Sequence, residues 1–245
     1  MTRLSHQLPP GRHGLPRSFV VRNQRERIID AVAEVSSAAG YGAMAVEDVI
    51  RWAGVSRRTF YDHFRSKEDA FLATYDEATN RLTGGVWRAQ ASAGTFAART
   101  RAGLEALLAF AASEPAFADM CIVQVLAAGP RAIERRNAML RAFEGLIIDN
   151  ARALPPERRP PPITAEVVVG GIYEVVRTHV VQGATRELPA VLPDLLFLAL
   201  LPYLGHDAAS EERRRALRRQ PRAWSEASPN LHNLTARPGD PLRFL

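Results

Sequence analysis

The stretch GVSRRTFYDHFRSKED, residues 54–69, decides the fold of the N-terminal part of the chain. Ser56 follows a glycine-containing turn and suits the N-cap of a helix, because its hydroxyl can accept a hydrogen bond from a free backbone N–H of the first turn. Phe60 and Phe64 are four residues apart and share one face of that helix, which must be buried. The remaining faces carry hydrogen-bonding and charged side chains: Arg57, Arg58, Thr59, Tyr61, Asp62 and His63.

A further helix is predicted to start directly after this one. Ser66 as N-cap, with Asp69 three residues later, has the pattern of a capping box. Lys67 lies in the first turn, where a cation is unfavourable because the N-terminal end of a helix dipole is itself positive. The position becomes favourable if an anion such as phosphate binds there. Lys67 is therefore a candidate phosphate ligand.

Two predicted helices precede the stretch at the spacing of a helix-turn-helix motif. The first is a helix of about 18 residues that ends before Gly40, and the second is the short segment 46–53. A helix this short needs its neighbours for stability. The spacing predicts that the helix after Ser56 is the recognition helix. The expected common core consists of Ile28, Ile29, Val32, Val46, Val49, Ala53, Phe60 and Phe64.

Residues 27–71, RIIDAVAEVSSAAGYGAMAVEDVIRWAGVSRRTFYDHFRSKEDAF, resemble the DNA-binding domain of the TetR/AcrR family of transcriptional regulators. AGVS, the T-F-Y-x-H-F core and the following S-K carry the resemblance. It implies that Arg57, Arg58 and Thr59 face base edges or the adjacent backbone. Tyr61 and His63 would then contact phosphates, and Lys67 would hold another. The implied DNA-binding residues are Ser56, Arg57, Arg58, Thr59, Tyr61, His63 and Lys67.

Three positions depart from the family pattern. Ala45 and Val46 stand where the family has Thr or Ser at the start of the second helix, so a cap or phosphate contact is lost unless Glu47 or a backbone N–H replaces it. Ile50 occupies a position where a small residue is common. Asp62 is an acid on the expected DNA face. It can accept from cytosine N4, pair with Arg58, or limit nonspecific affinity.

The rest of the chain also has helical periodicity and no strand-like alternation, so the predicted fold class is all-α with about nine helices. The expected order is a flexible basic arm (1–17), a three-helix DNA-binding domain (18–66), a larger helical domain (67–205) and a charged, irregular tail (206–245). The proline-rich segment 155–162 is the clearest linker. The arm could reach phosphates or a minor groove, or be a disordered terminus.

By resemblance, the larger domain binds a ligand and dimerises. Two strongly apolar helices, at about 163–185 and 189–204, would form the interface of a homodimer, the alternative being that they belong to the core of one chain. Aromatic and polar side chains among apolar positions are the candidate ligand-binding residues: Trp87, Phe110, Phe117, Gln124, Asn137, Phe143, Tyr173 and His179.

Composition excludes several other classes of function. The sole cysteine, Cys121, cannot form an internal disulfide and is expected to be buried and inert. The six histidines show no metal-ligand spacing, and no nucleophile–base pair or phosphate-binding loop indicates an enzyme. No cofactor is expected. The chain shows no signal peptide, and its most apolar stretch is short for a membrane span, so we expect a cytoplasmic protein.

These patterns favour a homodimeric regulator, most simply a repressor, that binds a palindromic double-stranded DNA operator and responds to a small molecule. The net charge of +6 agrees with such a partner, although Lys67 is the only lysine and the arginine content can also reflect coding bias. The alternative is a helical ligand-binding or scaffold protein whose helix-turn-helix no longer binds DNA.

Overall fold

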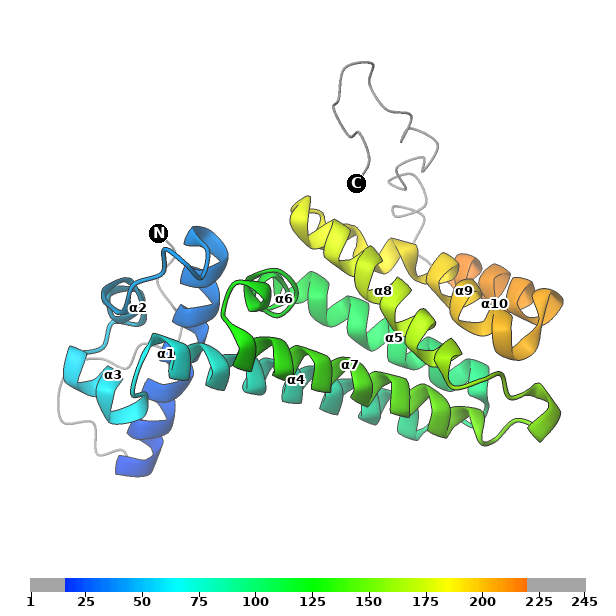
Figure 1. The fold of residues 1–245 in the computed structure, drawn as a ribbon, viewed down its shortest axis with the longest axis horizontal. Coiled ribbons are helices and arrows are strands. Elements are labelled where there is room, and N and C mark those ends of the chain that lie inside the picture. The colour runs from blue at the N-terminus through cyan, green and yellow to red at the C-terminus, as the bar shows by residue number, and fades with distance from the viewer. Residues whose placement is uncertain (1–15, 220–245) are drawn as a thin grey trace, which may run out of the picture.

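The computed structural model describes residues 16–219, and every regular element within them is a helix (Figure 1). Helices α1, α2 and α3 form one end of the molecule, and α4 runs from them into a bundle made by the later helices. The α-helices are α1 (Arg17–Ala39), α2 (Val46–Ala53), α3 (Arg57–His63), α4 (Lys67–Ala91), α5 (Phe96–Ser113), α6 (Pro115–Ile122), α7 (Pro130–Ala151), α8 (Ile163–Val181), α9 (Leu192–Leu204) and α10 (His206–Arg219). Short 3₁₀ turns are η1 (Gln124–Leu126), η2 (Pro156–Arg158) and η3 (Thr185–Val191).

The all-α prediction is confirmed, but the expected number of about nine helices is too low. Residues 16–219 contain ten, because His206–Arg219, which the sequence had placed in an irregular tail, forms α10. Ala209 and Ala216, two turns apart, are buried against the bundle, so this charged segment has one small apolar face. Residues 1–15 and 220–245, which include most of the expected arm and tail, lie outside the described part.

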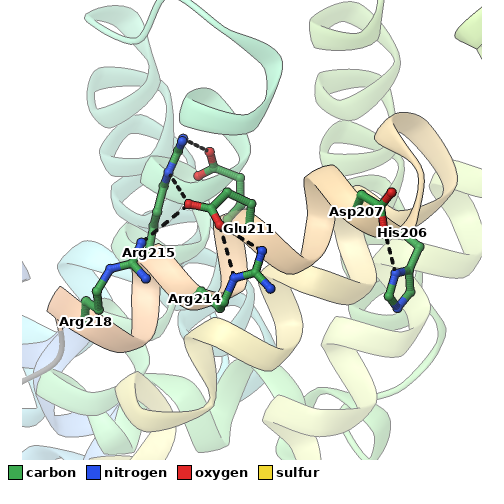
Figure 2. Close-up of polar contacts among 7 residues, drawn as sticks. His206, Asp207, Glu211, Arg214, Arg215 and Arg218 are labelled. Atoms are coloured by element: carbon green, nitrogen blue, oxygen red, sulfur yellow. Dashed lines mark hydrogen bonds and ion pairs between the residues drawn. The ribbon is translucent and has the colours of Figure 1, made fainter.

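Ion pairs along α10 account for its many arginines. Glu211 accepts hydrogen bonds from Arg214 and Arg215, and Arg218 approaches it to 3.5 Å (Figure 2). Arg213 reaches back to Asp194 of α9 at 2.6 Å. These exposed pairs contribute little stability one by one. They do neutralise the arginines locally, which agrees with a solvated helix rather than a contact surface.

Side-chain caps fix the starts of α3 and α4 where the sequence predicts them. The hydroxyl of Ser56 accepts from Thr59 N–H at 3.0 Å, and that of Ser66 accepts from Asp69 N–H at 3.1 Å. The carboxylate of Asp69 in turn accepts from Arg65 N–H at 2.9 Å. Each cap satisfies a backbone donor that the helix itself leaves free. The short turn between α3 and α4 is thereby fixed from both sides.

Two buried clusters hold the molecule together. The first joins the end formed by α1 to α3 to the bundle, because their side chains pack with residues of α4, α6, η1 and the start of α7. All eight expected core positions belong to it or pack against it, and Phe60 is fully buried. The second cluster lies within the bundle, among α5, α6, α8, η3, α9, α10 and the end of α7. Helix α6 thus contributes to both clusters.

One segment, Thr185–Leu204, is long and apolar enough to cross a membrane by length and composition alone. It consists of η3 and α9, and its leucines at 188, 195, 196 and 200 are among the most buried residues of the second cluster. Packing inside the bundle explains its apolar composition.

Arg27 joins α1 to the turn between α2 and α3. Its side chain is 8% exposed, and its guanidinium donates to the carbonyl oxygens of Ala53 and, at 2.7 Å, Gly54. Burial lowers the pKa of Arg27, although a guanidinium stays charged at any physiological pH. Those carbonyls end α2, where a cation is favourable. Arg27 therefore fixes where the recognition helix begins.

Arg27→Met should destabilise the end of the molecule formed by α1 to α3. The change keeps the apolar stem but leaves two carbonyl oxygens without their donor, for which we expect a loss of about 1–3 kcal/mol in the free energy of unfolding. Chemical denaturation followed by circular dichroism measures it. Arg22→Met, at an exposed position one turn and a half earlier in α1, is the control and should leave stability unchanged. Equal stability of both variants would contradict a structural role for Arg27.

Candidate nucleic-acid interface and ligand cavity

Helix α3 separates its side chains into a buried and an exposed set. Phe60 and Phe64 are 0% and 3% exposed, and their ring centroids lie 5.9 Å apart in the first core cluster. Arg57, Arg58 and Tyr61 point away from this core and are exposed, Tyr61 by 47%. Helix α3 itself lies at the edge of the molecule, away from the bundle (Figure 1). The predicted recognition helix thus presents an open cationic face.

The two arginines of this face have different surroundings. The guanidinium of Arg57 forms an ion pair with Glu47 of α2 and lies 5.7 Å from the centroid of the Tyr61 ring. Arg58 takes part in none of the ion pairs found within residues 16–219. Its guanidinium can therefore offer two parallel N–H groups to an acceptor such as guanine O6 and N7. Arg57 can contact a base in the same way only if its ion pair with Glu47 breaks or uses only part of its guanidinium.

The start of α2 shows how the chain manages without the family's hydroxyl residue. Ala45 is the N-cap and makes no side-chain cap hydrogen bond. Glu47 and Asp48 in the first turn place negative charge at the positive end of the helix dipole. The carboxylate of Glu47 also binds Arg57, so this residue helps to set the position of the recognition helix relative to α2.

Three neighbouring influences set the protonation state of His63. Burial lowers the pKa of His63, the positive charge of Arg25 lowers it further, and the charge of Asp62 opposes both. The imidazole is therefore neutral at physiological pH and able to donate one hydrogen bond. No ion pair joins Asp62 to Arg58 in the described part of the chain, so the pairing expected as one of three alternatives is absent from this structure.

Lys67 has partners within the protein. Its Nζ donates to the carbonyl oxygens of Tyr41 and Gly42, at 3.1 and 3.3 Å, and lies 4.6 Å from the centroid of the Tyr41 ring. These contacts hold the turn between α1 and α2 against the start of α4. They explain a lysine at this end of the helix without an anion. An ammonium group has three donors, so one N–H remains for a phosphate.

A cavity lies inside the bundle, between α4, α5, α6, α7 and α8. Its volume is about 120 Å³, which is several times the volume that one water molecule needs. Its lining is mostly aliphatic and aromatic, with side chains such as Val86, Leu104 and Met139. The lining residues of α7 run from Met139 to Asn150, a span of about 16 Å at the helical rise per residue. The cavity is therefore elongated and apolar.

One pair of amides forms the polar end of this cavity. Asn150 Nδ2 donates to Gln90 Oε1 at 3.0 Å, and Asn150 is only 8% exposed. Gly103 of α5 allows this arrangement, because a Cβ at that position would lie 2.3 Å from Gln90 Nε2. Buried amides bonded to each other keep spare donors and acceptors for a ligand.

At the opposite end, α6 separates the cavity from the DNA-binding end. Ala118, Cys121 and Ile122 line the cavity, whereas Phe117 and Met120 of the same helix belong to the first core cluster. Burial raises the pKa of Cys121 to about 12, so that the thiol stays protonated, as expected for an inert cysteine.

Just after α6, a hydrogen bond connects the bundle directly to the turn between α1 and α2. Gln124 Oε1 accepts from Tyr41 N–H at 3.0 Å, while its Nε2 donates to Asp119 at 3.0 Å. Tyr41 also contacts Lys67 through its carbonyl oxygen. A short series of hydrogen bonds thus joins the segment after α6 to the turn between α1 and α2 and to the start of α4.

Comparison with known proteins agrees with this architecture. Residues 28–74 match the sequence profile described as "Bacterial regulatory proteins, tetR family". This profile covers 47 of the 245 residues, so the N-terminal segment is the part of the chain that it relates to the TetR family. It is 32% identical over 87 residues to the HTH-type transcriptional activator FasR of Mycolicibacterium smegmatis, a match that spans 36% of this chain and 40% of that relative.

Solved structures extend the likeness to the bundle. The fatty acid degradation regulator FadR of Bacillus halodurans superposes with a TM-score of 0.65 at 19% identity, over 72% of this chain and 94% of that one. FadR of Bacillus subtilis in complex with stearoyl-CoA gives 0.64 at 19% identity, over 74% and 98%. At this identity the similarity establishes that the chain shares the fold of these two regulators.

Within this TetR-family fold, three of the eight candidate ligand residues line the cavity: Phe110, Phe143 and Tyr173. The phenol of Tyr173 donates to the carbonyl oxygen of Ile122 at 3.0 Å and accepts from Arg136 at 3.0 Å. It is therefore a fixed part of the wall rather than a free polar group.

The other five candidates lie elsewhere. Trp87 is 63% exposed on α4, one residue past the cavity-lining Val86, and Phe117 is buried in the first cluster. Asn137 accepts from Arg136 at 3.0 Å, and His179 Nδ1 lies 2.8 Å from the carbonyl oxygen of Val175. Gln124 serves the contact with Tyr41 described above. The sequence pattern could not separate these roles, because lining a cavity depends on how helices far apart in the chain meet.

Metal binding finds no support in the described residues, which contain no group of three or more His, Cys, Asp or Glu side chains arranged to hold an ion. The cavity is apolar enough to bind an apolar molecule, and the exposed arginines of α3 can contact an anionic one.

Ala111→Phe should fill part of the cavity and weaken the binding of apolar molecules. Ala111 lines the cavity and is 5% exposed. We expect the affinity for 1-anilinonaphthalene-8-sulfonate, measured by fluorescence titration, to fall about tenfold. Ala109→Phe, two residues earlier on the exposed side of α5, is the control and should bind the dye as the parent does. Thermal unfolding of both variants identifies any loss of fold caused by overpacking.

Proposed function

We propose that the protein is a dimeric, sequence-specific DNA-binding transcriptional regulator of the cytoplasm whose affinity for its operator is controlled by a small apolar ligand. The observation that carries the proposal is α3: a helix of seven residues, anchored by Phe60 and capped by Ser56, that exposes two arginines at the edge of a TetR-family fold. In the simplest form of this function, the unliganded dimer represses and the ligand releases it.

Each exposed group on α3 suits a distinct contact with DNA. Arg58 is free to read a guanine edge in the major groove, and Arg57 can read a second base if the bond to Glu47 yields to DNA. The hydroxyls of Thr59 and Tyr61, and the neutral imidazole of His63, can donate to phosphate oxygens. Ser56 keeps its cap, and Lys67 can add one N–H to a phosphate. The base contacts would determine which DNA sequence is bound, and the phosphate contacts would fix the position of the protein on the duplex.

Two exposed apolar surfaces support dimerisation through α8 and α9. Val167, Ile163 and Val181 of α8 are 67%, 59% and 58% exposed, and Leu198 of α9 is 57% exposed. Gly170 and Gly171 lie in the same exposed stretch of α8, and a Cβ at either would meet nothing within 4 Å. Such a surface lets another helix approach closely. The natural occupant is the same surface of a second copy, because isologous two-fold pairs are the commonest assembly.

The cavity supports a ligand with a long apolar part. It is elongated, mostly aliphatic and closed at one end by the amides of Gln90 and Asn150. A solved structural relative is in complex with stearoyl-CoA. A ligand that changes the position of α6 would act on the DNA-binding end through the shared core and through Gln124. Coupling free energies of about 1–3 kcal/mol are typical of such linked sites.

Two observations favour a second candidate, a ligand-binding protein that does not bind DNA. Glu47 occupies the guanidinium of Arg57, and Asp62 adds a negative charge to the exposed side of α3. A measurement of DNA affinity separates the two functions.

Arg58→Ala should reduce DNA affinity strongly and relax specificity at one base pair. Loss of a bidentate base contact costs about 1–3 kcal/mol, or roughly 5- to 150-fold in affinity. The operator is first selected from random double-stranded DNA, and fluorescence anisotropy then gives affinities at several salt concentrations. Arg141→Ala, an exposed arginine of α7 on the bundle, is the control and should bind as the parent does. If the parent shows no salt-dependent DNA binding, the ligand-binding alternative holds instead.

Val167→Glu should weaken or abolish the dimer. A carboxylate placed in an apolar interface loses its hydration, so the dimer dissociation constant should rise at least about a hundredfold. Sedimentation velocity over a concentration series measures it. Ala109→Glu, which adds the same charge to exposed α5, should leave the dimer intact. A Val167→Glu protein that dimerises as tightly as the parent would place the interface elsewhere.

A further inference from the structure

A second hollow lies beside the cavity, at the surface between α4 and α5. Its lining consists of Asn80, Arg81, Leu82, Gly85, Arg88, Ala106 and Phe110. Leu82 and Phe110 also line the main cavity. These two side chains therefore form the wall that separates an apolar interior from a hollow at the protein surface.

The charges of this second hollow differ from those of the cavity. Arg81 and Arg88 line it, and no carboxylate does. Arg81 is occupied, since it pairs with Glu114 at 2.8 Å and lies over the rings of Phe110 and Phe117 at 6.0 and 5.1 Å. Arg88 is exposed and takes part in none of the ion pairs found within residues 16–219. The hollow is therefore positive, with a guanidinium free to bind an anion.

One glycine of α4, Gly85, lines this hollow. Gly84 and Gly85 lie inside a helix that continues to Ala91, where each glycine costs about 1 kcal/mol relative to alanine. A Cβ at Gly85 would meet nothing within 4 Å, so no close packing requires a glycine there. What Gly85 does is line the hollow, on the same face of α4 as Arg81 and Arg88.

We propose that this hollow is the portal and head-group site for the ligand of the main cavity, and that the ligand is a long unbranched chain ending in an anionic group. The chain occupies the apolar cavity past Leu82 and Phe110, and the anionic group binds Arg88 above Gly85. This inference rests on the proposed function, because it specifies the ligand of the same regulatory site. A carboxylate and the phosphates of a thioester-linked coenzyme share this chemistry.

The test compares three sixteen-carbon probes with one apolar tail: palmitate, palmitoyl-CoA and 1-hexadecanol. Affinities are measured by displacement of 1-anilinonaphthalene-8-sulfonate or by calorimetry below the micelle concentration. Arg88→Ala should weaken palmitate, palmitoyl-CoA or both about tenfold and leave 1-hexadecanol unchanged, because only the anionic probes lose a charge-assisted hydrogen bond. The probe that loses more identifies carboxylate or coenzyme phosphate as the natural head group. Arg141→Ala is the control and should change none of the three.

A second variant tests the portal without removing a charge. Gly85→Leu fills the hollow and improves helix propensity, so the protein should fold at least as stably and bind palmitoyl-CoA about tenfold more weakly. The proposal is overturned if Arg88→Ala leaves both anionic probes unchanged, if it weakens 1-hexadecanol equally, or if the parent binds none of the probes. DNA affinity measured on the same preparations keeps the two proposals apart: DNA binding without probe binding refutes only this one.

Discussion

Burial of Phe60 and Phe64 is the constraint on which the DNA-binding end depends. Both rings must enter the core that α1, α2 and α4 share. This requirement fixes the orientation of α3 about its own axis. That orientation points Arg57, Arg58 and Tyr61 to solvent. The caps at Ser56 and Ser66 then fix where the helix starts and how the chain leaves it. The exposed cationic face is a consequence of the buried aromatic one.

Local patterns in the sequence were sufficient for this end of the molecule. Phenylalanine spacing, the two serine caps and the glycines at helix ends are short-range features, and the structure reproduces them within a residue or two. Two contacts escaped prediction because they join positions far apart in the chain. In the sequence, Arg27 is one of several arginines in a basic segment. Only the folded structure shows that α2 places two carbonyl oxygens beside its guanidinium. Lys67 was predicted to bind a phosphate, but its hydrogen bond to the carbonyl oxygen of Tyr41 was not predicted.

The bundle was less predictable for the same reason. Helical periodicity locates α5, α7 and α8, but it cannot say which apolar positions face a partner helix and which face a cavity. Gln90 and Asn150, the most informative polar pair in the cavity wall, are 60 residues apart and unremarkable in sequence. The segment that forms α10 was assigned to an irregular tail because its apolar side consists of two alanines among many charges. An apolar face this small cannot be recognised from the sequence, because only its packing against a neighbouring helix distinguishes it.

Helix α6 has eight residues and two functions, since one side closes the cavity and the other completes the core beneath the DNA-binding end. This arrangement divides the cavity wall into parts that can change in evolution at different cost. Substitutions on α5, α7 and α8 can reshape the space for a new ligand while the operator-reading end stays as it is. At Ala118, Cys121 and Ile122 the same freedom does not exist, because any change in volume there also displaces Phe117 and Met120. Under the proposed function, ligand preference can therefore change through substitutions on α5, α7 and α8, while α6 is retained because it also packs in the first core cluster.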